Sequence, residues 1–370
     1  MIKNPNYFSF TITERCQSHC TTCNGWQTPF KSIKDELSTE DWKFLLFEMQ
    51  KWLGNFDFIF SGGEPFVRED IFDIADYAKS IGLTPKVISN GLGLKDKCEQ
   101  LINSGFYEIT LSLNSIKNPN IHNLSRGRKD AFKITTDVIQ NLAYLNKKLN
   151  YPKKITIASI IMPSNISELE PLSKFAHQNK TGICFQLMDN GDSFFYARNT
   201  AKEYNKLFDE MKNDAFAAID NLKTLKTQGY LIYNTNEQLD SFKEILINSV
   251  NKCKYENNEE KEIPVYAREG FNYSDRVSED KINRYDLYHR EASNYISPRE
   301  YVTADGCHVG YRNFSIDPYG GVRICLSMPP IASLKEDLPQ NIWNSEKADL
   351  LREKIMNCNK SCKFLNCNYG

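Results

Sequence analysis

The sequence predicts an α/β fold, a partial (β/α)6 TIM-like barrel followed by a small C-terminal cysteine-rich α+β module. Residues 7–188 alternate short strand patterns with amphipathic helix patterns six times over. Cysteine-rich and glycine-rich motifs follow the first strands, where the carboxyl ends of parallel strands meet. Five of the eleven cysteines gather in residues 307–367, after the repeated units end.

The six units follow one another with short connections. The strand patterns span residues 7–13, 56–60, 84–91, 107–114, 154–162 and 182–188. The helix patterns between them span residues 38–53, 69–82, 95–105, 131–149 and 167–179. Ser38 and Asp41 begin the first helix with a capping-box pattern, and Gly82 ends the second. Strands joined by helices predict a parallel sheet that either stays open or curls into a partial barrel.

The chain divides into three regions. Residues 1–200 form the predicted core, residues 201–303 a helical extension with a polar, tyrosine-rich segment, and residues 304–370 the cysteine-rich module. The extension continues with a helix, a strand at 229–234 and a helix at 236–247. Its polar segment is typical of a lid or linker, or of a solvated insertion without a role. Residues 314–325 predict a β-hairpin, and residues 346–356 a closing helix.

Composition narrows the class of protein. The net charge is -1, so no overall field favours nucleic acid or a membrane surface. The N-terminus has no apolar run of signal-peptide length, and no stretch approaches the ~18 apolar residues of a membrane span. We therefore expect a cytoplasmic protein. Disulfides are disfavoured in that compartment, so the cysteines indicate metal ligation or catalysis.

Three cysteines lie on the loop after the first strand, in the spacing Cys16-x3-Cys20-x2-Cys23. Three thiolates hold three corners of a [4Fe–4S] cluster and leave the fourth iron without a protein ligand. An open metal position is what binding of a substrate or cofactor requires. The alternatives are a zinc site, for which His19 lies within the motif, or incidental cysteines.

The segment CQSHCTTC resembles the CxxxCxxC signature of the radical S-adenosylmethionine (SAM) superfamily, and the resemblance extends over residues 7 to about 190. It implies that Cys16, Cys20 and Cys23 hold a catalytic cluster whose open iron binds SAM. It also implies that an electron, from a partner such as flavodoxin or ferredoxin, cleaves the sulfonium. The resulting 5′-deoxyadenosyl radical then abstracts hydrogen from a substrate.

The segment SGGEP, at residues 61–65, is similar to the GGE motif of the same family. The resemblance implies that Gly62 and Gly63 let the backbone approach the cofactor closely, and that Glu64 faces the methionyl ammonium of SAM.

Four further positions end the third and fourth strands. The resemblance implies contacts with the methionyl or ribose part of SAM from Ser89, Asn90, Ser112 and Asn114. Asn114 replaces an Asp often found there, and all four also suit turn or cap chemistry.

Two other segments bear on the resemblance. Arg126-Gly127 with Phe132 resembles an RG…F segment of peptide-modifying members. Thr22 departs from the pattern, because many members have an aromatic residue directly before the third cysteine. Trp26 either replaces that aromatic residue near the adenine or packs in the fold.

The C-terminal cysteines form a second group. Their spacing resembles the SPASM/twitch extensions that hold auxiliary [4Fe–4S] clusters, with a zinc ribbon as the alternative. Five cysteines fit one cluster with one to spare, so we expect a twitch-like module with a single auxiliary cluster. The resemblance implies Cys307 and Cys325 as ligands, with two more from Cys358, Cys362 and Cys367.

We expect a peptide or protein maturase that forms a crosslink or alters a side chain. One alternative is a dehydrogenase or epimerase of a small sugar or aminocyclitol. Another, from a different class, is a non-catalytic iron–sulfur electron carrier, which needs no open iron.

Overall fold

The computed structural model describes residues 4–23, 25–26, 32–150, 152–187, 210–255 and 307–358. The six predicted strands are present, as β1 (Tyr7–Thr13), β2 (Asp57–Gly62), β3 (Thr84–Ser89), β4 (Glu108–Ser112), β5 (Lys154–Ile161) and β6 (Gly182–Leu187). The helices between them are α1 (Thr39–Leu53), α2 (Ile71–Ser80), α3 (Cys98–Asn103), α4 (Pro119–Arg126), α5 (Ala131–Asn146) and α6 (Leu169–Gln178).

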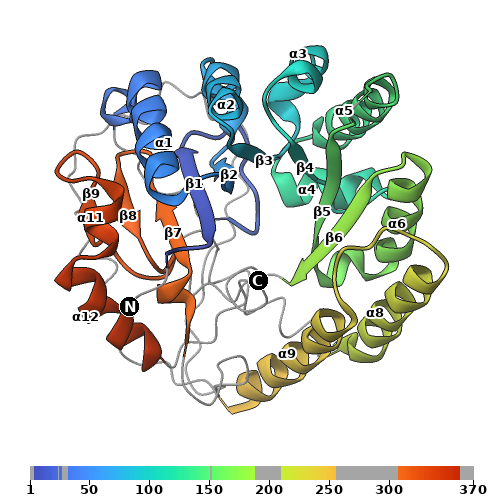
Figure 1. Ribbon diagram of the computed structural model, residues 1–370. Helices are drawn as coiled ribbons and strands as arrows, with labels where there is room; N and C mark the ends of the chain where they lie inside the picture. The colour runs from blue at the N-terminus through green and yellow to red at the C-terminus, as the bar shows by residue number, and fades with distance from the viewer. Residues whose placement is uncertain are drawn as a thin grey trace.

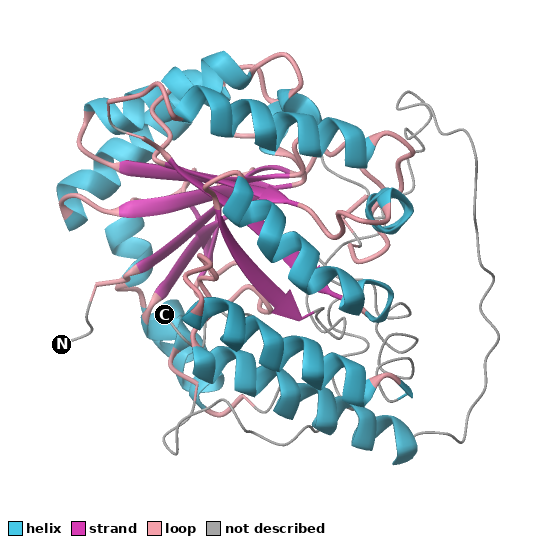
Figure 2. Ribbon diagram, turned by 90° about the vertical axis from the view of Figure 1, so that its right-hand side faces the viewer, coloured by secondary structure: helices cyan, strands magenta, loops and turns pink. Residues whose placement is uncertain are grey.

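The strands form one sheet in the order β6-β5-β4-β3-β2-β1-β7-β8-β9, in which β1 to β6 pair in parallel. The helices α1, α2, α3 and α5 lie around the outside of the curved sheet (Figure 1). Figure 2 shows the strands fanning out as the sheet twists. The predicted α/β fold with a parallel sheet is therefore confirmed, and the sheet is open, as in a partial barrel.

The C-terminal residues join the same sheet. Strand β7 (Asn313–Ile316) pairs in parallel with β1, and β8 (Gly321–Arg323) pairs antiparallel with β7 as the predicted hairpin. Strand β9 (Ala332–Ser333) then pairs with β8. The helices α11 (Pro339–Trp343) and α12 (Glu346–Met356) follow. The hairpin thus extends the sheet that carries the first cysteine loop, which the sequence did not predict.

The outer face of the sheet carries the apolar core. Trp42 of α1 is buried, with its ring centroid 5.9 Å from that of Phe10 and 5.6 Å from that of Phe60. The predicted capping box of α1 is confirmed, since the Ser38 Oγ accepts from the Asp41 N–H and the Asp41 carboxylate accepts from the Ser38 N–H. Burial of large apolar side chains on this face drives the fold.

The inner face of the sheet carries polar side chains interspersed with a few apolar ones, Ile59, Ile88, Ala158 and Ile160. Near the start of the strands, Glu108 lies 3.1 Å from the Lys154 ammonium and 4.0 Å from that of Lys86, which also pairs with Asp57. Further along, the described residues that β1 to β6 place on this face carry no charge, while Arg323 of β8, the register partner of Ser315, does. The strand register places on it the polar side chains of Ser9, Thr11, Ser61, Thr110, Ser112, Thr156, Cys184, Gln186 and Ser315.

Two local features differ from the sequence predictions. Helix α4 was not predicted. The strand expected at 229–234 is reduced to a single bridge between Ile183 and Ile232, flanked by α8 (Lys212–Thr227) and α9 (Asn236–Tyr255). The closing helix predicted at 346–356 is confirmed as α12, whose N-cap is the Ser345 hydroxyl. In the part of the chain that the structure describes, no helix combines the length and apolarity needed to cross a membrane.

Candidate active site

The loop after β1 brings N–H donors to all three cysteine sulfurs. The Ser18 N–H lies 3.4 Å from the Cys16 Sγ, and the Gly25 N–H lies 3.3 Å from the Cys23 Sγ. The Cys20 Sγ lies 3.8 Å from the Nη1 of Arg126. N–H donors to sulfur stabilise thiolates and tune the metal groups that they bind.

The C-terminus of α4 holds this loop in place. The His19 N–H donates to the Arg126 carbonyl and the Thr21 N–H to the Ser125 carbonyl, both at 3.1 Å. Gly127 ends α4 with a φ of 63°, and a Cβ there would lie 2.3 Å from the His19 carbonyl oxygen. Only glycine therefore allows this close approach of helix and loop.

Trp26 belongs to the loop itself. Its indole N–H donates to the Cys20 carbonyl at 2.9 Å, and its ring centroid lies 5.1 Å from that of His19. The described contacts of Trp26 are therefore with the cysteine loop, which supports the packing alternative for this residue. Thr22, directly before the third cysteine, is buried.

The glycine motif after β2 packs against the start of the same loop. The Gly63 N–H donates to the Thr13 carbonyl and the Glu64 N–H to the Arg15 carbonyl, both at 2.8 Å. A Cβ at Gly62 or Gly63 would lie 2.2 Å from those same carbonyl oxygens. The close approach that the glycines permit is thus between two backbone segments; an approach to the cofactor stays a prediction.

The Glu64 carboxylate is fully buried and joins two strand ends. It accepts from the Ser89 hydroxyl at 2.8 Å, from the Asn90 N–H at 2.7 Å and from the Phe66 N–H at 3.2 Å. Burial raises the pKa of Glu64 to about 7, against the lowering effect of these donors and of Arg126. Glu64, Ser89 and Asn90, predicted from separate motifs, therefore meet at one point.

The two predicted positions at the end of β4 differ from each other. Ser112 is half-buried on the inner face. The buried Asn114 is held by the protein, since its side-chain amide donates to the Ser125 hydroxyl at 2.9 Å and accepts from the Ile160 N–H at 3.1 Å. Asn114 thus ties β4 to α4 and β5, while Ser112 faces the open side of the sheet.

The donor set fits a cluster better than a single ion. Among the described residues, no three His, Cys, Asp or Glu side chains converge on one ion position. Zinc needs four ligands around one point, whereas a cluster binds each sulfur through a different iron. Burial raises the pKa of Cys16 to about 12 and that of Cys23 to about 11, so metal binding would displace their protons.

The C-terminal cysteines come from separate elements. Cys307 precedes the short helix η6 (Val309–Tyr311), Cys325 follows β8, and Cys358 follows α12. Burial raises the pKa of Cys307, and charge on Cys358 adds to the effect. Cys362 and Cys367 lie outside the described residues.

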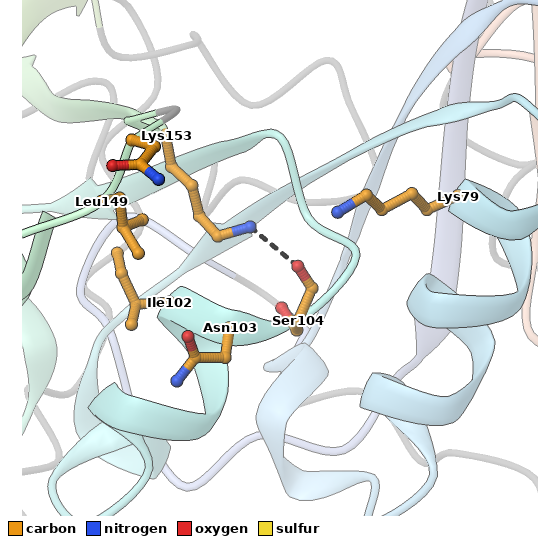
Figure 3. Close-up of a pocket in the computed structure, with 7 residues that line it drawn as sticks. Lys79, Ile102, Asn103, Ser104, Leu149 and Lys153 are labelled. Carbon is orange, nitrogen blue, oxygen red and sulfur yellow. Dashed lines mark hydrogen bonds between the residues drawn. The ribbon is translucent and has the colours of Figure 1, made fainter.

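A pocket on the described surface lies away from both cysteine groups (Figure 3). Its lining residues precede β3, β4 and β5, so the pocket lies at the amino-terminal ends of these strands, opposite the end that carries the cysteine loop. The Lys153 ammonium donates there to the Ser104 carbonyl at 2.7 Å. Burial and the nearby Lys79 lower the pKa of Lys153 to about 8. These contacts tie the end of α3 to the start of β5 and take no part in the cysteine site.

Family models agree with this geometry. The model of the radical SAM superfamily matches residues 10–176, and SPASM, described as an iron–sulfur cluster-binding domain, matches residues 307–368. The chain therefore carries a radical SAM domain and, at residues 307–368, a SPASM domain.

Two curated relatives are each 28% identical to this chain. They are an AdoMet-dependent heme synthase of Methanosarcina barkeri, aligned over 179 residues, and a GTP 3′,8-cyclase of Saccharophagus degradans, aligned over 183. Each alignment covers 48% of this chain, and 49% and 53% of the respective relative. The chain thus spans about half the length of these relatives.

Two solved structures share the fold. SuiB of Streptococcus suis bound to the precursor peptide SuiA aligns with a TM-score of 0.57 and 13% identity, over 94% of this chain and 66% of that chain. The structure of anSMEcpe with bound AdoMet aligns with a TM-score of 0.55 and 14% identity, over 99% of this chain and 88% of that chain. At these identities the likeness concerns the fold alone.

Proposed function

We propose that this protein is a radical SAM enzyme that modifies a peptide or protein, by forming a crosslink or altering a side chain. The observation that carries the proposal is the loop on which three cysteine sulfurs each receive an N–H donor, beside the buried Glu64 carboxylate. When bound, the cluster and SAM supply a 5′-deoxyadenosyl radical, and the protein aims it at one C–H bond and excludes water.

Each residue of the candidate active site has its own role in binding the cluster or SAM. Cys16, Cys20 and Cys23 hold the cluster and leave one iron open. Glu64 accepts from the amino group of SAM, with the glycine motif setting its backbone. Ser89 and Asn90 orient that carboxylate through their measured contacts with it.

Farther along the sheet, Ser112 contacts the ribose or carboxylate of SAM, and Asn114 supports that strand end. The boundaries at residues 200 and 303 separate the core, the extension and the cysteine module. The protein acts in the cytoplasm, where its thiols stay reduced.

The inner face supports a peptide as the substrate. Beyond the row of Lys86, Glu108 and Lys154, the described residues of β3 to β6 on this face are uncharged, and several carry hydroxyl groups. A nucleoside triphosphate or a tetrapyrrole carboxylate calls for cations, while backbone amides suit hydroxyl and carboxamide partners. The same face would also suit a polyol, so a sugar or aminocyclitol dehydrogenase is the second candidate.

The C-terminal cysteines hold one auxiliary cluster. Cys307 and Cys325 are ligands, completed by two of Cys358, Cys362 and Cys367. This cluster takes the electron released when a substrate radical is oxidised, or passes electrons to the first cluster. A flavodoxin or ferredoxin supplies the electron that starts each turnover.

The first test asks whether the chain cleaves SAM. Anaerobically reconstituted full-length protein, SAM and dithionite should give 5′-deoxyadenosine. Cys16→Ala should abolish the product, while the matched control Cys98→Ala, in α3 outside the site, should retain it. Product formation would exclude the electron carrier, and no product from well-reconstituted wild type would overturn the proposal.

The second test chooses the substrate. Peptides encoded beside the gene, and sugars or aminocyclitols, would each be offered with deuterium at their C–H positions. Transfer of deuterium into 5′-deoxyadenosine from a peptide, with loss of two hydrogen atoms or a changed side chain in its mass spectrum, is the expected result. Transfer from the polyols alone would establish the second candidate.

A further inference from the structure

Two side chains outside the cysteine motif reach its sulfurs. The Asn90 Nδ2 lies 3.7 Å from the Cys16 Sγ, and the Arg126 Nη1 lies 3.8 Å from the Cys20 Sγ. One comes from the end of β3 and the other is the last residue of α4. The resemblance to known members implies a role for Asn90 in binding SAM; the geometry adds contacts with the cluster ligands themselves.

Both residues are anchored to the surrounding structure. The Asn90 Oδ1 accepts from the Leu92 N–H at 2.8 Å, and the Asn90 N–H donates to Glu64. The Arg126 carbonyl accepts from the His19 N–H of the cysteine loop. The Asn90 amide is thus fixed at its oxygen, and the backbone from which the Arg126 side chain extends is fixed against the cysteine loop, so the fold positions both residues beside the sulfurs.

Arg126 also brings positive charge to the site. Its guanidinium acts to lower the pKa values of Cys23 and Glu64, so it lies close to both. Its Nε is buried and has no hydrogen-bond partner among the described residues. The cation is therefore placed where thiolates and a carboxylate gather.

Electron transfer to this site increases its negative charge. One electron from a low-potential donor reduces the cluster from its 2+ to its 1+ state, with no protein bond made or broken. Hydrogen bonds to the sulfurs and nearby positive charge stabilise the reduced state and raise the reduction potential. A hydrogen bond from a charged donor is roughly twice as strong as one from a neutral donor.

We propose that Asn90 and Arg126 are positioning residues that raise the reduction potential of the N-terminal cluster through the sulfurs of Cys16 and Cys20. The inference rests on the proposed function, because it requires a cluster at these cysteines. Arg126 has the larger effect, since its contact carries a full charge.

The test is a redox titration of reconstituted full-length protein followed by electron paramagnetic resonance. The signal that changes when SAM is added identifies the N-terminal cluster. Arg126→Gln should lower its midpoint potential by the equivalent of a tenfold change in the reduction equilibrium, about 59 mV for one electron. Asn90→Ala should lower it less, and Arg126→Lys should restore most of the wild-type value.

The matched control is Lys129→Gln, which removes an equal charge from an exposed position three residues away. Solvent and salt screen that charge, so the potential should not move. An unchanged potential in Arg126→Gln and Asn90→Ala, or an equal shift in Lys129→Gln, would overturn the inference.

Iron content separates this role from simple bracing of the loop. A variant that takes up less iron, but whose remaining cluster keeps the wild-type potential, would show bracing alone and overturn the inference. If Arg126→Gln takes up no iron, the midpoint potentials of Asn90→Ala and Arg126→Lys, compared with that of wild type, test the inference instead. Wild type without a SAM-responsive signal would instead refute the proposed function, a separate outcome.

Discussion

The two cysteine regions are built in different ways. Cys16, Cys20 and Cys23 share one loop after β1, and their donors reach them from neighbouring strand ends and from α4. The described C-terminal cysteines are spread over residues 307–358 and lie beside three separate elements, η6, β8 and α12. The first region can be recognised from a short stretch of sequence, while the second depends on long-range packing.

A single buried cation organises the C-terminal region. The side chain of Arg352 is 1% exposed and lies with its guanidinium carbon 4.3 Å from the ring centroid of Trp343. It donates to the Gly310 carbonyl at 3.1 Å and to the Trp343 carbonyl at 2.7 Å. These contacts fix α12, which Cys358 follows, against η6, which Cys307 precedes. The second site therefore depends on a residue that no cysteine pattern points to.

The largest expected effect separates the two regions by activity. Cys16→Ala should lower SAM cleavage by more than about 100-fold, beyond the range for outer-shell partners of a metal site. Cys307→Ala should retain SAM cleavage while losing substrate turnover. Iron should fall from about eight to about four per chain in each variant. Iron analysis measures the cluster content, and chromatography of 5′-deoxyadenosine measures SAM cleavage. An equal loss of SAM cleavage in Cys16→Ala and Cys307→Ala would contradict separate roles for the two cysteine regions.

The sequence predicted the local features of the fold well. The six strands of the core lie where period-two apolar patterns ended in glycine or polar turns, and Ser38 caps α1 as its pattern indicated. The meeting of Glu64 with Ser89 and Asn90 also follows from topology, because carboxyl ends of adjacent parallel strands lie side by side.

The missed features are weak or non-local signals. Helix α4 has a polar sequence, PNIHNLSR, without an apolar stripe, although Asn118, Pro119 and Gly127 are start and stop signals in hindsight. The sequence showed the Arg126-Gly127 pair without its contact with the cysteine loop. Pairing of β7 with β1 joins residues about three hundred positions apart, which no window of sequence reveals.

The second prediction concerns the packing of α4 on the first region. Gly127→Ala should destabilise the protein by about 2–4 kcal/mol, because the positive φ costs about 1 kcal/mol and the contact with the His19 carbonyl adds overpacking. Gly229→Ala is the control, since Gly229 has a φ of 89° and open space around it. In this control variant, the loss of unfolding free energy measured by urea denaturation should equal the cost of the positive φ alone. Equal losses of stability in the two variants would mean that the close contact between α4 and the cysteine loop adds no cost.

The third prediction addresses the second region. Arg352→Met should destabilise the protein by about 2 kcal/mol, because buried carbonyls lose their donor. It should also lower the iron bound at the C-terminal cysteines while SAM cleavage persists. Lys347→Met, exposed on the same helix, is the control and should change neither property. Full iron content in Arg352→Met would show that the C-terminal site forms without this contact.

The smallest expected effect tests the chemistry of the first region through pH. Because burial raises the pKa of Glu64 to about 7, its carboxyl group is neutral below that pH and negative above it. If the anion accepts from the amino group of SAM, affinity for SAM should rise about tenfold between pH 6 and pH 8, and Glu64→Gln should flatten the profile. Equilibrium dialysis of reconstituted protein measures the affinity.

The raised pKa of Glu64 has the opposite consequence for stability, since the folded protein holds this proton more tightly than the unfolded chain does. Wild type should therefore lose stability relative to Glu64→Gln as pH rises from about 4.5 to about 7. An affinity that falls over the same range in which stability falls would assign the pH effect to the fold and refute direct recognition of SAM by Glu64.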